Sequence, residues 1–143
     1  MTTVRSTLLR LAVCAALPLA AACGGDETQA PDDHTPVAYT MSVGGVEVAA
    51  PLTLTEGQTV RVRLHFVNAA DDDLDDVESS HFGGLAFEPS SLATVARVAG
   101  HNYQFDVTGG TPGTGDALVS YGHDEDADGT TLDAFDVVVQ DAP

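Results

Sequence analysis

From Val37 onward, apolar and polar residues alternate in short runs that turn residues separate. The clearest run spans residues 58–67, where every second residue is apolar. Successive side chains of a strand point to opposite sides, so this alternation predicts a strand with one buried face. The apolar face holds Val60, Val62, Leu64 and Phe66, and the polar face holds Arg61, Arg63 and His65.

The same pattern predicts further strands, and no window shows a sustained helical period. The expected strands cover residues 37–43, 46–54, 58–67, 80–88, 92–98, 102–108, 116–122 and 132–140. Residues 46–54 are expected to continue as one edge segment, and residues 92–98 could instead form a single helical turn. About seven short strands in about 100 residues are typical of an all-β fold, an Ig-like antiparallel β-sandwich. In that fold strand 58–67 pairs with strand 102–108, which places Arg61 and Arg63 beside Gln104 and Asp106.

Three short stretches resemble bacterial Ig-like (BIG-type) domains. They are LTEGQTV at 54–60, PSSLATV at 89–95 and GTG at 113–115. The resemblance covers roughly residues 37–140 and departs from the family by long acidic loops and by the absence of Trp. It implies an adhesion, spacer or carbohydrate-contact module rather than an enzyme, and it transfers no functional residues.

The first 25 residues resemble a bacterial lipoprotein signal. Two arginines precede an apolar run over residues 11–22, which ends in LAAAC at 19–23. The run is shorter than the roughly 20 residues of a membrane-spanning helix. The resemblance implies cleavage before Cys23 and a diacylglyceryl thioether on its sulfur. An ordinary secretory signal, cut near Ala22 to leave a free thiol, is the alternative.

The predicted organisation therefore has three parts. Residues 1–22 are the signal peptide, 23–36 are the lipidated cysteine and a flexible tether, and 37–143 are the sandwich. The tether is rich in turn residues and acids, and its His34 is expected to be solvated. The expected location is the cell envelope, outside the cytoplasm, with the lipid on Cys23 holding the domain at the outer membrane or cell surface.

Charge narrows the possible partners. After removal of the leader the chain keeps three arginines, no lysine and all 22 acidic residues. Such a surface repels nucleic acid and anionic lipid headgroups and favours cations. The sequence contains no nucleophile elbow and no glycine-rich phosphate loop, so we expect no enzyme, with a metal-dependent hydrolase as the remaining enzymatic alternative.

Two acidic clusters lie in predicted loops. Residues 71–78 hold six acids in eight positions, and residues 124–129 read DEDADG. The second cluster matches the first half of a calcium loop, but its twelfth position is Phe135 where an EF-hand carries Glu. Solvated loops are the ordinary reading of such clusters.

The topology of an Ig sandwich brings the B–C, D–E and F–G loops to one end. Every histidine after residue 37 falls at or near that end in the predicted strand order. We therefore predict a metal site there, with primary ligands His81, His101, His123, Asp124, Asp126 and Asp128. The secondary candidates are His65, Asp71, Asp73 and Asp75. Imidazole with carboxylate suits zinc, copper or nickel, whereas carboxylates alone suit calcium.

Together these observations predict a lipid-anchored, extracytoplasmic Ig-like module that binds a divalent metal ion. The alternative is a structural, adhesion or spacer module that contacts a cell-envelope protein or glycan without a metal.

Overall fold

The computed structural model describes residues 34–75, 80–123, 126–127 and 129–143. The predicted signal, Cys23 and the tether up to residue 33 lie outside this part. The described residues form ten strands, and no helix among them is long and apolar enough to cross a membrane. The strands are β1 (Ala38–Val43), β2 (Val46–Glu47), β3 (Leu52–Thr55), β4 (Thr59–Val67), β5 (Phe82–Glu88), β6 (Ala93–Arg97), β7 (Gln104–Gly109), β8 (Gly113–Gly122), β9 (Thr130–Thr131) and β10 (Phe135–Gln140).

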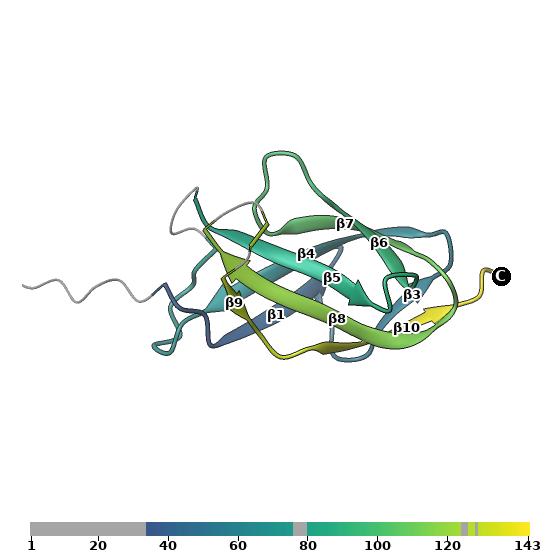
Figure 1. Ribbon diagram of the computed structural model, residues 1–143, viewed down its shortest axis with the longest axis horizontal. Helices are drawn as coiled ribbons and strands as arrows, with labels where there is room; N and C mark the ends of the chain where they lie inside the picture. The colour runs from purple at the N-terminus through teal and green to yellow at the C-terminus, as the bar shows by residue number, and fades with distance from the viewer. Residues whose placement is uncertain (1–33, 76–79, 124–125, 128) are drawn as a thin grey trace, which may run out of the picture. The chain divides into compact units, whose positions relative to one another are not determined.

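Two sheets pack face to face in a β-sandwich, with β1 beginning at one end and β10 ending at the other (Figure 1). One sheet has the order β2-β1-β4-β7-β6, and the other has the order β3-β10-β8-β5 with β9 paired to β8. Strands β1, β4, β7 and β6 correspond to A, B, E and D of an Ig domain, and β5, β8 and β10 to C, F and G. The predicted Ig-like sandwich is confirmed, with one parallel pair, β3 with β10, among otherwise antiparallel described pairs.

The segment 46–54, predicted to be one edge segment, is divided between the two sheets. Strand β2 pairs with β1 in one sheet, and β3 pairs with β10 in the other. Pro51 immediately precedes β3. Proline has no N–H to donate to a strand ladder, so a continuous strand through this position is disfavoured and the chain changes sheet here.

Two further segments differ from the sequence prediction. Residues 93–97 form strand β6, so the helical-turn alternative for 92–98 is wrong. Residues 113–115, which lie before the strand predicted over residues 116–122, begin the long strand β8. A side chain at Gly115 would place its Cβ 2.2 Å from the carbonyl oxygen of Glu88. Glycine therefore serves here to let two strands approach closely rather than to form a turn.

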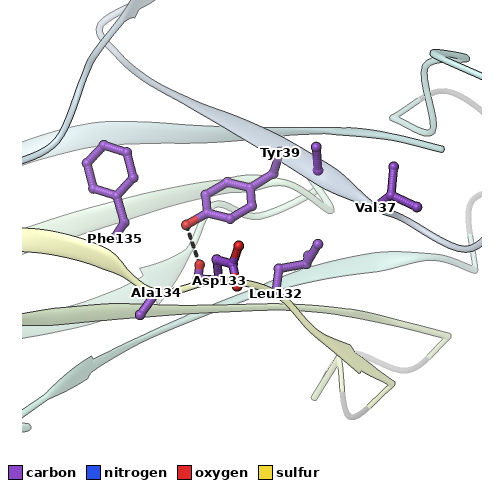
Figure 2. A pocket seen from close by; sticks show the side chains of 7 residues that line it. Val37, Tyr39, Leu132, Asp133, Ala134 and Phe135 are labelled. Atoms are coloured by element: carbon purple, nitrogen blue, oxygen red, sulfur yellow. Dashed lines mark hydrogen bonds between the residues drawn. The ribbon is translucent and has the colours of Figure 1, made fainter. Parts of the chain in front are cut away.

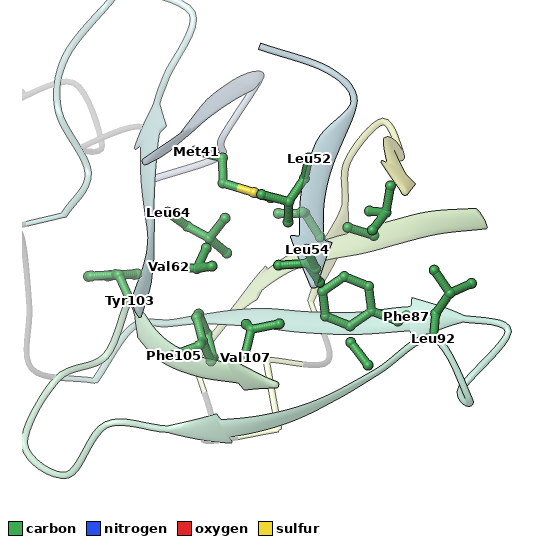
Figure 3. Close-up of a cluster of buried hydrophobic side chains, with 14 of the residues drawn as sticks. Met41, Leu52, Leu54, Val62, Leu64, Phe87, Leu92, Tyr103, Phe105 and Val107 are labelled. Carbon is green, nitrogen blue, oxygen red and sulfur yellow. The ribbon is translucent and has the colours of Figure 1, made fainter. Parts of the chain in front are cut away.

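The core lies between the sheets and draws side chains from both of them (Figure 3). Val62, Leu64 and Phe66 of β4 are fully buried, which confirms the alternation that predicted this strand. Met41 of β1 is also fully buried, although the sequence did not single it out. Because no cysteine lies in the described residues, side-chain packing rather than a disulfide joins the two sheets there.

The pairing of β4 with β7 places Arg61 opposite Asp106 and Arg63 opposite Gln104, as predicted. Arg61 donates two hydrogen bonds to Asp106, from Nε to Oδ1 at 2.9 Å and from Nη2 to Oδ2 at 3.1 Å. Both side chains are about half exposed, so solvent screens this pair. Arg63 turns instead toward Asp75, which follows β4 in the chain.

Candidate metal centre

The loops between β4 and β5, between β6 and β7, and after β8 meet at one end of the sandwich, as the Ig topology predicts. The Nδ2 atom of Asn102, in the β6–β7 turn, donates to the carbonyl oxygen of His81 at 2.7 Å. His81 directly precedes β5, and its ring contacts that of His123, which directly follows β8. The predicted gathering of these loops is therefore present in the structure.

Three histidines form what we call the imidazole cluster: His34, His81 and His123. The ring centroids of His81 and His123 are 4.1 Å apart, and those of His34 and His81 are 5.1 Å apart. His81 lies in the middle and is 1% exposed, whereas His123 lies at the surface. The three rings come from three separate segments, which precede β1, precede β5 and follow β8.

Aromatic side chains support the cluster from inside the sandwich. The ring of His81 stacks on Tyr121 with centroids 5.4 Å apart, and Tyr121 packs on Phe66 at 5.1 Å. Phe66 in turn packs on Tyr103 at 5.8 Å. A side chain at Gly83 would place its Cβ 3.0 Å from the Phe66 ring, so glycine leaves the space that this aromatic group fills.

Arg97 fixes the start of β5 beside the cluster. Its guanidinium lies 5.3 Å from the centroid of Phe82 and 5.1 Å from that of Phe105, within the range of cation–π attraction. It also donates to the carbonyl oxygens of Gly83, at 2.8 Å, and of Asn102. The sequence pattern gave Arg97 no role in the site. The available signal was that this arginine lies in a predicted strand and that other predicted strands carry phenylalanines.

A cavity of about 160 Å³ adjoins the cluster. Its lining includes His34, Tyr121, His123 and Thr130. The Nε2 atom of His34 is buried and has no hydrogen-bond partner among the described residues. Buried polar atoms in proteins normally have a partner, so this nitrogen points to a group that the cluster could hold.

The expectation that His34 is solvated is wrong. Its side chain is partly buried, its ring packs edge-on against His81, and Pro36 is buried as well. The reason is that the chain enters β1 at the same end of the sandwich as His81 and His123. The last residues of the predicted tether, 34–36, are thus packed on the domain.

The remaining primary ligands are placed differently. His101 lies at the same end, in the β6–β7 turn, but it is exposed and has no ring contact with the cluster among the described residues. Asp126 is exposed, and Ala127 beside it is buried. Asp124 and Asp128 lie outside the described residues. Of the predicted primary set, the described structure therefore brings His81 and His123 into contact.

A second group joins three of the secondary candidates, His65, Asp73 and Asp75. One ligand atom from each lies within 4.8 Å of the other two, which is close enough for a shared ion. The Nδ1 atom of His65 is 2.8 Å from Oδ2 of Asp75 and 3.6 Å from Oδ1 of Asp73. Asp71 is exposed with a positive φ of 63°, and it is not part of this group.

Protein groups already surround the carboxylate of Asp75, whose side chain is 1% exposed. Its Oδ2 accepts a bond from Nη2 of Arg63 at 3.1 Å as well as the contact with His65. Its Oδ1 accepts the backbone N–H of Phe66 at 2.9 Å. Because the guanidinium supplies the positive charge that a metal would bring, this arrangement, which we call the Asp75 network, acts as a structural brace.

The acidic run is accordingly folded, not open, over residues 71–75. The side chain of Leu74 is 2% exposed, and its N–H donates to the carbonyl oxygen of Phe66 at 2.9 Å. The Oδ1 atom of Asn68 accepts the N–H groups of Ala70 and Asp72, each at 2.9 Å, and closes the preceding turn. The expectation of a solvated loop holds for residues 71–73, which are exposed, and is wrong for Leu74 and Asp75, which are buried. Residues 76–78 of the run lie outside the described part.

A lateral pocket of about 270 Å³ lies between β1 and the segment that leads into β10 (Figure 2). Tyr39 partly fills it and donates from its hydroxyl to the carbonyl oxygen of Asp133 at 2.8 Å. Burial, together with the nearby Asp133 charge, raises the pKa of Tyr39 above its usual value. The lining holds one carboxylate, that of Asp133, and no histidine, so this pocket does not offer the imidazoles of the predicted metal site.

Comparison of the chain with protein-family models and with curated proteins finds no match in either set.

Proposed function

We propose that this chain is a lipid-anchored, extracytoplasmic Ig-like module that binds a divalent metal ion at the end of the sandwich that holds the imidazole cluster. It acts as a binding module and not as an enzyme. The partner classes are the membrane, through lipid on Cys23, and a metal ion, with zinc or copper favoured and calcium as the alternative.

One observation carries the metal-binding part of the proposal. His34, His81 and His123 come from segments far apart in the sequence, yet their rings are in contact. Imidazole is a common protein ligand for zinc, copper and nickel. The chain also carries 22 acidic residues against five basic ones, and this excess concentrates cations near its surface.

The anchoring part rests on the leader, which ends in small residues before Cys23. We predict that the mature protein partitions into the detergent phase, because several acyl chains give stable membrane attachment. Cys23→Ser should shift the protein to the aqueous phase or leave the leader uncleaved. Mass spectrometry of the N-terminal peptide is the measurement, and wild-type protein that carries a free, unmodified thiol would contradict the anchor.

The metal-binding part is tested by titration of the purified, chelator-treated protein with zinc, copper and calcium. We expect at least one of them to bind in the micromolar range or tighter, and to raise the melting temperature as a ligand of the native state does. Isothermal calorimetry and thermal unfolding measure both quantities. If all three ions bind more weakly than about millimolar, metal binding is excluded as the function.

That outcome would favour the alternative, an adhesion or spacer module. The described strands β5 and β6 lie at the ends of their sheets, so each has one edge that pairs with no described strand. Such edges can add a strand from a partner protein.

A further inference from the structure

We infer that the ion is held by three imidazoles, with His34 as the third ligand, and that it is a transition metal of the zinc, copper or nickel class rather than calcium. This inference deepens the proposed function and rests on it. His34 lies before the domain as the sequence defines it, and the sequence pattern gave it no role.

The ring centroids are spaced about as a shared ion requires, and the side chains must rotate to bring their nitrogens together, because the ligand atoms of the described residues that already lie within 4.8 Å of one another belong to His65, Asp73 and Asp75. At a metal–nitrogen distance of about 2.0–2.1 Å, the centroids of two imidazoles on one tetrahedral ion lie about 5 Å apart. The centroids of His34 and His81 are 5.1 Å apart, so these two rings need to turn but not to separate. Those of His81 and His123 are 4.1 Å apart, so these two rings must separate by about an ångström. His123 is exposed and can make this adjustment by rotating its side chain.

The chemistry of the donors selects the class of ion. Calcium takes six to eight oxygen ligands, whereas ring nitrogens suit zinc, copper and nickel. The rings of the cluster contact one another and Tyr121. The buried Nε2 atom of His34 supplies a nitrogen that no described group engages. Three imidazole nitrogens would fill three coordination positions of the ion and leave the fourth facing the adjoining cavity. Zinc and copper accept such an arrangement.

The involvement of His34 has a structural consequence. This residue precedes β1, whereas His81 and His123 flank β5 and β8 in the other sheet. An ion bound by all three would join the chain entering the domain to the loops of the opposite sheet. Metal binding would then fix the entering segment on the sandwich as well as stabilise the loops.

The experiment compares zinc and calcium binding by the full-length protein and by five single variants. His34→Ala, His81→Phe and His123→Ala each remove one proposed ligand, and phenylalanine keeps a ring at the buried position of His81. His101→Ala is the matched control, because it removes an exposed histidine at the same end of the sandwich. His65→Ala removes the histidine of the Asp75 network. Circular dichroism and the melting temperature without metal establish that each variant is folded.

For the wild type we expect zinc to bind at least 100-fold more tightly than calcium. We expect a loss of at least tenfold in zinc affinity in each of the three cluster variants and a change of less than about threefold in the two controls, since each ligand contributes directly to the ion. In a copper-loaded sample, the nitrogen hyperfine pattern in electron paramagnetic resonance should lose one imidazole in His34→Ala.

Two results would overturn the inference and leave the proposed function standing. One is unchanged zinc affinity and an unchanged copper spectrum in His34→Ala, combined with loss of binding in His81→Phe and His123→Ala. The other is tight binding of calcium with weak binding of zinc. Absence of tight binding for every ion tested would instead overturn the proposed function itself, and the inference with it.

Discussion

The two histidine groups differ in what surrounds each imidazole. His65 lies against the carboxylate of Asp75, which also accepts bonds from Arg63 and from the backbone N–H of Phe66. The ring of His81 instead packs on Tyr121, His34 and His123. The first group is balanced by a cation of the protein, whereas the second brings three imidazoles together on an aromatic support.

This difference shows why proximity of ligand atoms is a weak guide to a metal site. The Asp75 network brings its ligand atoms closest together, within 4.8 Å, yet the arginine already neutralises its buried carboxylate. An ion held there would replace the contact between His65 and Asp75 and would lie close to the guanidinium of Arg63, whose positive charge opposes it. The imidazole cluster has less convergent nitrogens but contains a buried donor, His34 Nε2, that no described group engages. The balance of charges and hydrogen bonds, more than distance, separates a brace from a binding site.

The largest expected effect on stability tests the brace. Asp75→Ala removes the acceptor of the buried Phe66 N–H and leaves Arg63 and His65 without their shared partner. We predict a loss of about 2–4 kcal/mol in the free energy of unfolding. Denaturant unfolding monitored by circular dichroism gives this value. Zinc affinity should stay within about threefold of the wild type, because Asp75 belongs to the brace and not to the imidazole cluster.

Asp73→Asn is the control, since Asp73 is half exposed and contacts the same histidine at the longer distance of 3.6 Å, and asparagine keeps an oxygen that can accept the N–H of Asp75, as Oδ1 of Asp73 does at 2.8 Å. It should cost less than about 1 kcal/mol, as exposed ion pairs usually do. The roles assigned to the Asp75 network and the imidazole cluster would be reversed if Asp75→Ala abolished zinc binding and changed the free energy of unfolding little. In that case the Asp75 network, and not the imidazole cluster, would be the metal site.

Much of the fold was predictable because one strand carried a strong local signal. Strict alternation over residues 58–67 fixed which side chains of β4 enter the core, and the buried Val62, Leu64 and Phe66 agree with it. The sheet change between β2 and β3 was not predictable in this way. Alternation reports which face of a strand is buried but not which neighbour the strand pairs with, and β3 obtains its parallel partner from the far end of the chain.

The candidate site was predictable at the level of topology but not of individual residues. Placing the loops of an Ig fold at one end correctly brought His81 and His123 together. The same reasoning included His101, which is exposed in its turn, and excluded His34, which precedes the first strand. Whether a histidine next to a strand packs inward depends on how the neighbouring chain is buried in the folded domain. Pro36, two residues after His34, is buried. A turn-rich, acidic composition gave no local sign of that packing.

A smaller effect sharpens the contrast between buried and exposed ion pairs on the same strand. Arg61 and Arg63 lie two residues apart on β4 and are about equally exposed, with side-chain exposures of 52% and 51%. Their partners differ, since Asp106 is 42% exposed and Asp75 is 1% exposed.

Arg63→Ala removes the cation next to the buried carboxylate of Asp75, although His65 and the Phe66 N–H remain as partners of that carboxylate. We predict a loss of about 1–2 kcal/mol for Arg63→Ala and of less than about 1 kcal/mol for Arg61→Ala. Raising the salt concentration should reduce the Arg61 effect more, because solvent ions screen an exposed pair better than one with a buried partner. Equal losses that respond equally to salt would show that Asp75 is as hydrated as Asp106, and the Asp75 network could then no longer be described as a buried brace.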